Sequence, residues 1–178
     1  MNLFILRHAS AGTRRINPLL DVKRPLDKEG KQYSLQLAYI LQAMKIQFDV
    51  ILSSPLKRAL QTAQLVGTES GYEAPVLLST ALAPSATITD FHKLVQEVQV
   101  HENVLVVGHS PNIENFLGSM LVPTSSHLSA NVRLRKGTIA RVSVQRGTST
   151  LMWMLDPRTV RALYATSTKS SRRKTSRK

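Results

Sequence analysis

Short apolar runs alternate with amphipathic stretches along the first two thirds of the chain. The apolar runs at residues 3–6, 50–52 and 104–107 are bounded by polar residues, as buried strands are, and predict strands at 3–6, 50–53 and 104–107. Residues 75–78 are a candidate for a further short strand. Apolar residues at helical spacing predict helices at residues 28–44, 55–67, 87–99 and 112–121. Asp27 is placed to cap the first of these helices, and Pro55 suits the first turn of the second. Strands and helices in alternation predict a largely parallel sheet.

Beyond Pro123 the pattern changes to alternating apolar and polar positions. The alternating segments cover residues 132–134, 138–144 and 150–155, with Gly137 and Gly147 between them. Alternation interrupted by glycine predicts hairpins. We therefore expect a three-layer α/β/α sandwich around a mostly parallel mixed sheet, with antiparallel strands at one edge. Residues 9–26 contain Gly and Pro and are predicted to form a loop across the end of the first strand.

The composition fits one folded domain. The chain has 178 residues, 42% of them hydrophobic, so it can bury a sizeable core, which we place in residues 1–165. It has no cysteine, which excludes disulfides, thiolate metal sites and cysteine nucleophiles. No apolar stretch reaches the ~20 residues that span a bilayer, and the first residues lack the pattern of a signal peptide. We expect a cytoplasmic protein.

Almost half of the formal net charge of +13 lies at the end of the chain. Six Lys and Arg residues lie within the last ten positions, which contain no acidic residue, and the rest of the chain carries +7. Residues 166–178 form a basic tail rich in Ser and Thr that we expect to be disordered. Such a tail can make weak electrostatic contacts with RNA, DNA or another anionic surface, although most tails of this kind are merely solvated.

Candidate chemistry lies at the ends of three predicted strands. Arg7 and His8 follow the first, Arg58 comes soon after the second, and His109 follows the third. Because the carboxyl ends of parallel strands meet at one edge of a sheet, these side chains are expected to share a site. Arginine forks and helix N-termini favour phosphate oxygens, so the pattern predicts a phosphate pocket.

A histidine in such a pocket can act as a nucleophile on phosphorus. It must be neutral at the attacking nitrogen while its other nitrogen holds a proton in a fixed hydrogen bond. His8 sits in a tight turn, where a backbone carbonyl can accept that bond. His109 would then stabilise the phosphoryl oxygens, either as an imidazolium or as a neutral N–H donor.

Three segments of the chain resemble the motifs of one family. The segments are Leu6-Arg7-His8-Ala9, Ser53-Ser54-Pro55-Leu56-Lys57-Arg58-Ala59-Leu60-Gln61-Thr62-Ala63 and Val107-Gly108-His109-Ser110-Pro111. In order and length, residues 1–160 resemble the histidine phosphatase superfamily, the phosphoglycerate mutase-like group, and within it the small phosphohistidine phosphatases of the SixA type. The resemblance implies that His8 is the phosphorylated nucleophile and that Arg7, Arg58 and His109 form the phosphate pocket. It also implies that Arg24 is an additional anion contact, and that neither a metal nor a cofactor is required.

Two departures from the family pattern bear on the substrate. Ala9 replaces the usual glycine, a mild change if φ stays negative there. Many relatives carry an acidic residue between the second arginine and the second histidine to protonate the leaving group, but residues 79–86 contain none. A phosphoimidazole protonated at its other nitrogen departs as neutral imidazole without such an acid. The sequence therefore favours phosphohistidine, unless Asp90, Glu97 or water supplies the proton.

The sequence thus predicts a metal-independent phosphatase that acts through phosphorylated His8. The expected substrate is phosphohistidine on a protein, such as a histidine-containing phosphotransfer domain. One alternative is a phosphatase of small phosphate esters, which requires a general acid. The other is a non-catalytic phosphate-binding or RNA-binding protein, which needs the arginines but not a nucleophile.

Overall fold

One mixed sheet organises the protein. The computed structural model describes residues 1–122, 129–146 and 148–175. Its strands lie in the order β3-β2-β4-β1-β5-β6, in which β1 to β4 are parallel and β5 and β6 are antiparallel additions at one edge. The strands are β1 (Asn2–Arg7), β2 (Val50–Ser53), β3 (Leu77–Leu78), β4 (Asn103–Gly108), β5 (Ile139–Gln145) and β6 (Thr148–Leu155). The predicted mixed sheet with an antiparallel edge is confirmed.

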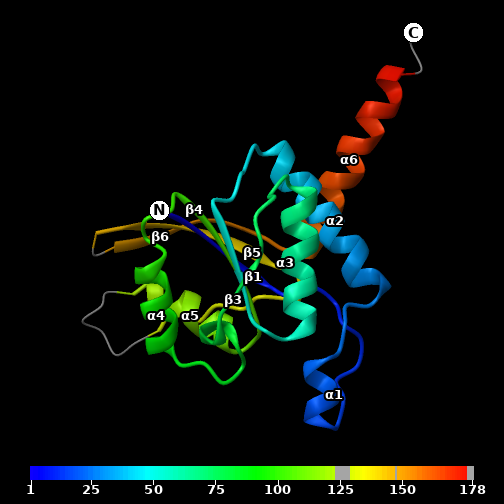
Figure 1. The fold of residues 1–178 in the computed structure, drawn as a ribbon. Coiled ribbons are helices and arrows are strands. Elements are labelled where there is room, and N and C mark those ends of the chain that lie inside the picture. The colour runs from blue at the N-terminus through cyan, green and yellow to red at the C-terminus, as the bar shows by residue number, and fades with distance from the viewer. Residues whose placement is uncertain (123–128, 147, 176–178) are drawn as a thin grey trace.

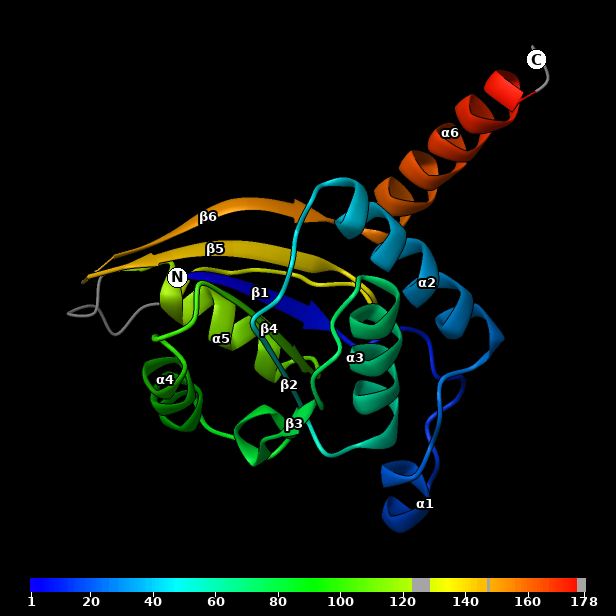
Figure 2. The ribbon, with the colours of Figure 1, turned by 45° about the horizontal axis from the view of Figure 1, so that its top comes forward.

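Helices cover both faces of this sheet, which gives the three predicted layers (Figures 1 and 2). The helices α2 (Lys28–Ala43) and α3 (Lys57–Glu69) lie on one face, and α4 (Ile88–Glu97) and α5 (Asn112–Met120) lie on the other. Shorter or peripheral elements are α1 (Pro18–Val22), the 3-10 turn η1 (Thr80–Leu82) and α6 (Pro157–Thr175). The phosphoglycerate mutase-like architecture expected from the motifs is therefore present.

The pleat of the central strands divides the core into two halves. On β1, Leu3 and Ile5 pack into the cluster under α4 and α5, whereas Phe4 and Leu6 pack into the cluster under α2 and α3. Because successive side chains of a strand point to opposite faces, a strand buried on both faces must be apolar throughout. This requirement explains the uninterrupted apolar run that the sequence shows at residues 3–6.

The strand register brings the carboxyl-terminal ends of three strands together along one edge of the sheet, the edge at which these strands end. Arg7 at the end of β1 pairs with Gly108 of β4, and Ser53 at the end of β2 pairs with Val107. Since β2, β4 and β1 are adjacent and parallel, the residues that follow them emerge side by side. This edge is the one at which the sequence predicts the phosphate pocket.

Two local predictions were wrong. The loop 9–26 contains the short helix α1, which begins at Pro18 and is capped by the Asn17 side chain accepting a bond from the Leu19 N–H. Residues 132–134 form no strand, because side chains rather than a neighbouring strand bond the backbone of Leu134. Gly147, predicted to be a turn residue, lies outside the described residues.

The helix α6 extends the chain away from the sheet (Figure 2). Its first turns pack on α2, with the rings of Tyr39 and Tyr164 edge to face at 5.2 Å between centroids. It continues to Thr175, within the segment from residue 166 onward that the sequence predicts to be disordered. Residues that favour helix, such as Ala162, Leu163 and Ala165, lead into this segment. The division into a domain and a tail at residue 165 stays a prediction. Among the described residues, no helix is long and apolar enough to cross a membrane.

Candidate active site

The backbone after β1 fixes the ring of His8. Its Nδ1 atom lies 2.7 Å from the carbonyl oxygen of Ala9. A carbonyl oxygen only accepts, so Nδ1 carries the proton and Nε2 carries the lone pair. The His8 side chain is buried, and its ring centroid lies 5.0 Å from that of His109. The hydrogen bond that the turn was expected to supply is therefore present.

A glycine turn holds the backbone of the same segment. The N–H of Gly137 lies 3.0 Å from the Arg7 carbonyl oxygen and 3.2 Å from that of His8. Gly137 has φ of +87°, a conformation that favours glycine, and a Cβ atom there would lie 2.4 Å from the Tyr33 ring. The Tyr33 hydroxyl donates to the Gly137 carbonyl oxygen at 2.6 Å. Helix α2 thus supports the strand end through this turn.

His109 is oriented by a hydroxyl group at the end of β2. Its Nε2 atom lies 2.8 Å from Ser54 Oγ, which also accepts a 3.3 Å bond from the Leu56 N–H. Ser54 is fully buried, and among the described residues the His109 ring is the only acceptor for its hydroxyl proton. Because a buried hydroxyl needs an acceptor, Ser54 donates to Nε2. His109 therefore carries its own proton on Nδ1.

Arg7 is anchored by the segment between α5 and β5. Its Nη1 atom donates to the Leu134 carbonyl oxygen at 2.5 Å, and the Leu134 N–H donates to Glu114 at 2.7 Å. The carboxylate of Glu114 also accepts a hydrogen bond from the Ser110 hydroxyl. The segment after α5 thus becomes a support for Arg7 rather than a strand.

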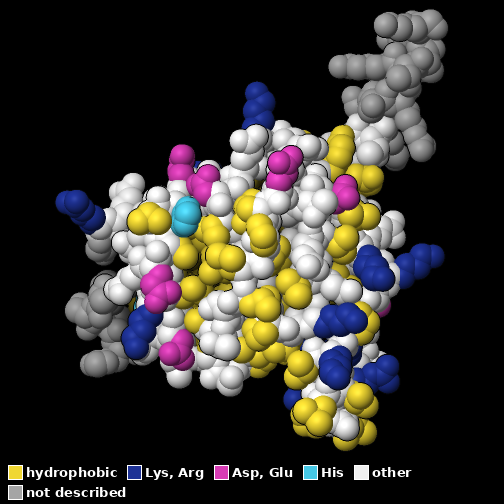
Figure 3. Space-filling view, in the orientation of Figure 1, with side chains coloured by type: hydrophobic (Ala, Val, Ile, Leu, Met, Phe, Trp, Pro, Cys, Tyr) yellow, Lys and Arg dark blue, Asp and Glu magenta, His cyan; other side chains and the backbone are white. Residues whose placement is uncertain are grey.

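Arg58 lies in the first turn of α3 and contacts α1. Its Nη1 atom donates to the backbone carbonyl of Asp21 at 3.0 Å and to the Asp21 carboxylate at 3.3 Å. Arg24 also binds Asp21, at 2.8 Å, and donates to the Ala11 carbonyl oxygen at 2.7 Å. The Arg24 guanidinium thus braces the loop beside Arg58, and its role as an anion contact stays a prediction. Figure 3 shows hydrophobic side chains with Lys and Arg beside them where α1 projects.

Three buried nitrogen atoms of this cluster lack a partner. Within the described ranges, Arg7 Nε, Arg58 Nε and His109 Nδ1 have no hydrogen-bond acceptor. Each is a donor, Nδ1 by the tautomer that Ser54 imposes. Buried donors without an acceptor are rare in folded proteins and costly, so their grouping beside one histidine is suited to an anionic ligand.

The environment keeps both histidines neutral. Burial is the main cause that lowers the pKa of His8 to about 3 and that of His109 to about 2, and the positive charges of Arg7 and Arg58 add to it. At neutral pH His8 therefore presents an unprotonated Nε2. Of the two roles left open for His109, the neutral N–H donor is the one that fits this electrostatic setting.

The carboxyl groups raised as proton donors are poorly suited to that role. Asp90 forms the capping box of α4 with Thr87, and these hydrogen bonds lower its pKa. Glu97 ends α4, which connects the parallel strands β3 and β4 and so runs antiparallel to them. Glu97 therefore lies toward the amino-terminal ends of the strands, away from the site. The segment 83–86 does lie near the site, because Asn112 at the start of α5 donates to its carbonyl groups, but it carries no acidic side chain.

The described residues contain no group of three His, Cys, Asp or Glu side chains that could hold a metal ion. Separately from this finding, the ends of β1, β2 and β4 bring two neutral imidazoles together with the guanidinium groups of Arg7 and Arg58.

Comparisons with known proteins agree with the motifs and the fold. The model of the histidine phosphatase superfamily, branch 1, matches residues 3–83. The resemblance to the histidine phosphatase superfamily is confirmed. An uncharacterized protein of Picosynechococcus sp. is 28% identical over 141 residues, which cover 78% of this chain and 82% of that protein.

Phosphohistidine phosphatase SixA of Escherichia coli is 26% identical over 160 residues, which cover 88% of this chain and 94% of SixA. A structure of the protein histidine phosphatase SixA complexed with tungstate matches with a TM-score of 0.78 and 26% identity. The match covers 88% of this chain and 97% of that one. These similarities to the histidine phosphatase superfamily indicate a phosphatase with a phosphate-bearing substrate.

Several residues of the site were not predicted from the sequence. The sequence shows Ser54 only as part of a motif, and it predicts no part in the site for Asp21, Glu114 or Gly137. Gly137 carried a usable signal, because a glycine in an alternating segment often marks a turn. Asp21 and Glu114 carried none, since both reach the site through contacts between distant segments.

Proposed function

We propose that this protein is a metal-independent phosphatase that acts through phosphorylated His8 and that its substrate is phosphohistidine on a protein. The observation that carries the proposal is the grouping of unpartnered donors on Arg7, Arg58 and His109 beside a histidine whose Nδ1 is already bonded. Similarity to SixA, whose structure holds the oxyanion tungstate, supports the same reading.

In the first step, His8 Nε2 forms a bond to phosphorus while the bond from phosphorus to the substrate nitrogen breaks. The leaving imidazole keeps the electron pair and retains the proton on its other nitrogen, so it departs neutral. The donors of Arg7, Arg58 and His109 stabilise the charge on the phosphoryl oxygens, which is the main task in phosphoryl transfer.

In the second step, water forms a bond to phosphorus and the bond to His8 Nε2 breaks. The electron pair returns to Nε2, and Nδ1 keeps its proton, which stays hydrogen-bonded to the Ala9 carbonyl oxygen. One proton of the attacking water passes to phosphate or solvent. Neither step needs a carboxylic acid. A mechanism without an acid fits the absence of acidic side chains from segment 83–86, which lies near the site.

The test is phosphate release from a phosphohistidine peptide, a phosphoserine peptide and a small phosphate ester, without added metal. We expect the wild type to release phosphate selectively from phosphohistidine and His8→Asn to be inactive. Equal rates on the esters would reveal a general acid and overturn the substrate assignment. Turnover by His8→Asn equal to that of the wild type would overturn the mechanism.

A further inference from the structure

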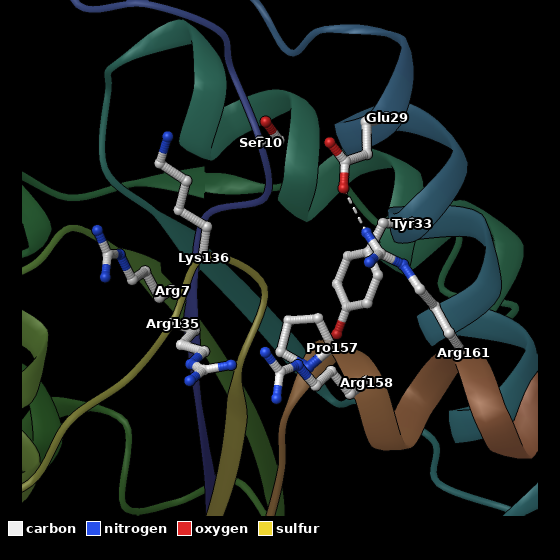
Figure 4. A pocket seen from close by; sticks show the side chains of 9 residues that line it. All are labelled: Arg7, Ser10, Glu29, Tyr33, Arg135, Lys136, Pro157, Arg158 and Arg161. Carbon is white, nitrogen blue, oxygen red and sulfur yellow. Dashed lines mark hydrogen bonds and ion pairs between the residues drawn. The ribbon is translucent and has the colours of Figure 1, made fainter.

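A second basic pocket adjoins the phosphate site. It has a volume of about 390 Å³ and shares Arg7 with that site. Figure 4 shows the side chains that line it. Its walls come from the end of β1, the start of α2, the turn before β5 and the start of α6. The lining residues are Arg7, Ser10, Glu29, Tyr33, Arg135, Lys136, Pro157, Arg158 and Arg161.

The charge of this pocket is strongly unbalanced. Five of its side chains are cationic, and its one carboxylate, Glu29, forms an ion pair with Arg161 at 2.5 Å (Figure 4). The other ion pairs among the described residues involve Asp21 with Arg24 and Arg58, so Arg135, Lys136 and Arg158 have no ion-pair partner there. Such a cluster favours an anion.

The pocket lies beside the segment that carries His8, since Arg7 and Ser10 line it. Arg135 and Lys136 directly precede Gly137, whose N–H bonds the carbonyl groups of Arg7 and His8. Lys136 lies close enough for its charge to contribute to the lowered pKa of His8. A group bound here would therefore be held next to the phosphoryl group and not at a remote surface.

The size and exposure of the pocket indicate what kind of anion it takes. About 390 Å³ exceeds the needs of a lone phosphate and lies in the range of sites for small organic groups. Tyr33 and Pro157 supply uncharged wall that can pack against a hydrocarbon stem. Arg135, Lys136 and Arg158 are exposed, so a side chain presented by a macromolecular surface can reach them. Arginine forks pair with carboxylates through two parallel hydrogen bonds.

We propose that this pocket binds an Asp or Glu side chain that lies near the phosphohistidine of the protein substrate. The inference rests on the proposed function and adds to it a preference for acidic sequence around the phosphorylated residue. Arg135 and Arg158 would form the ion pairs, with Lys136 adding attraction at the boundary with His8.

The test uses two phosphohistidine peptides that differ only in Glu or Gln at the flanking positions. We expect the wild type to favour the Glu peptide by about five- to tenfold in kcat/KM, as a few partly exposed ion pairs would provide. The double variant Arg135→Gln/Arg158→Gln should lose most of this preference, because only Lys136 and the paired Arg161 then remain beside Arg7 in the pocket.

A control with the same loss of charge is Arg146→Gln/Lys93→Gln, whose positions do not line the pocket. This control should keep the wild-type preference, and added salt should reduce the preference in both proteins. Equal kcat/KM of the wild type for the two peptides would overturn the inference while leaving the proposed function intact. Failure of the wild type on both peptides would instead overturn the proposed function on which it rests.

Discussion

His8 Nδ1 and the carbonyl oxygen of Ala9 lie 2.7 Å apart, within the turn that follows β1. This bond is made by neighbouring residues, so the tautomer of His8 is set locally, within the turn itself. Ser54 and His109 achieve the same for the second imidazole, but across the sheet between the ends of β2 and β4. The two rings thus present opposite roles, a lone pair on His8 and an N–H on His109.

The buried histidines should make the protein less stable in acid. The unfolded chain takes up a proton on His8 below a pKa of about 6.5, whereas the folded protein does so only near pH 3, because burial opposes the charged ring. The stabilising contribution is thus fully present above pH 6.5 and is lost as the pH falls toward about 3. The loss is about 1.4 kcal/mol per pH unit for each such histidine.

Denaturant unfolding at pH about 7.5 and about 5 measures this effect. Between the two pH values, we expect the free energy of unfolding of His8→Gln to fall by about 2 kcal/mol less than that of the wild type, because the Gln side chain does not titrate. His101→Gln, outside the site, is the control and should behave as the wild type does. An equal loss in His8→Gln and the wild type would contradict the buried neutral imidazole.

Ser54 should affect turnover through the ring of His109. Ser54→Ala removes the hydroxyl that donates to His109 Nε2, so Nδ1 no longer holds its proton reliably toward the phosphoryl group. We expect kcat to fall by about tenfold, the effect of one buried hydrogen bond, with little change in KM. The matched control is Ser53→Ala, which removes a hydroxyl that bonds only the Ser54 carbonyl among the described residues. The same kinetic effect from both substitutions would refute the positioning role.

Gly137 should be intolerant of a side chain. Gly137→Ala places a methyl group 2.4 Å from the Tyr33 ring and forces alanine into φ of +87°. Strain alone costs roughly 1–3 kcal/mol, and the steric contact adds to it. Gly12→Ala is the control, because Gly12 also has positive φ but nothing lies within 4 Å of its would-be Cβ. Unfolding free energies should show the larger loss in Gly137→Ala, and equal losses would mean that Tyr33 does not constrain the turn.

The sequence predicted those parts of the fold that depend on local pattern. The apolar runs at 3–6, 50–53 and 104–107 became adjacent parallel strands, and Asp27 caps α2 through its bond to the Gly30 N–H, as expected. The placement of Arg7, His8, Arg58 and His109 at one edge followed from those strands, because residues after parallel strands emerge together.

The rest depends on contacts that no local pattern encodes. Val132-Arg133-Leu134 alternates like a strand, but the carboxylate of Glu114 and the guanidinium of Arg7 bond the Leu134 backbone instead. In the sequence, Asp21 is one polar residue of a predicted loop, and its contact with Arg58 arises only from the position of α1 in the fold. The second basic pocket combines segments from the two ends of the chain, and so it had no signature within either.

Detection of phosphate on His8 itself tests the central claim most directly. The enzyme is mixed with a phosphohistidine peptide, quenched within the first turnover under alkaline conditions that preserve phosphohistidine, and digested for mass spectrometry. We expect one phosphoryl group on the proteolytic fragment of the wild-type enzyme that contains His8 and none on the corresponding fragment of His8→Asn. Phosphate release at the full rate with His8 unmodified throughout the first turnover would contradict it.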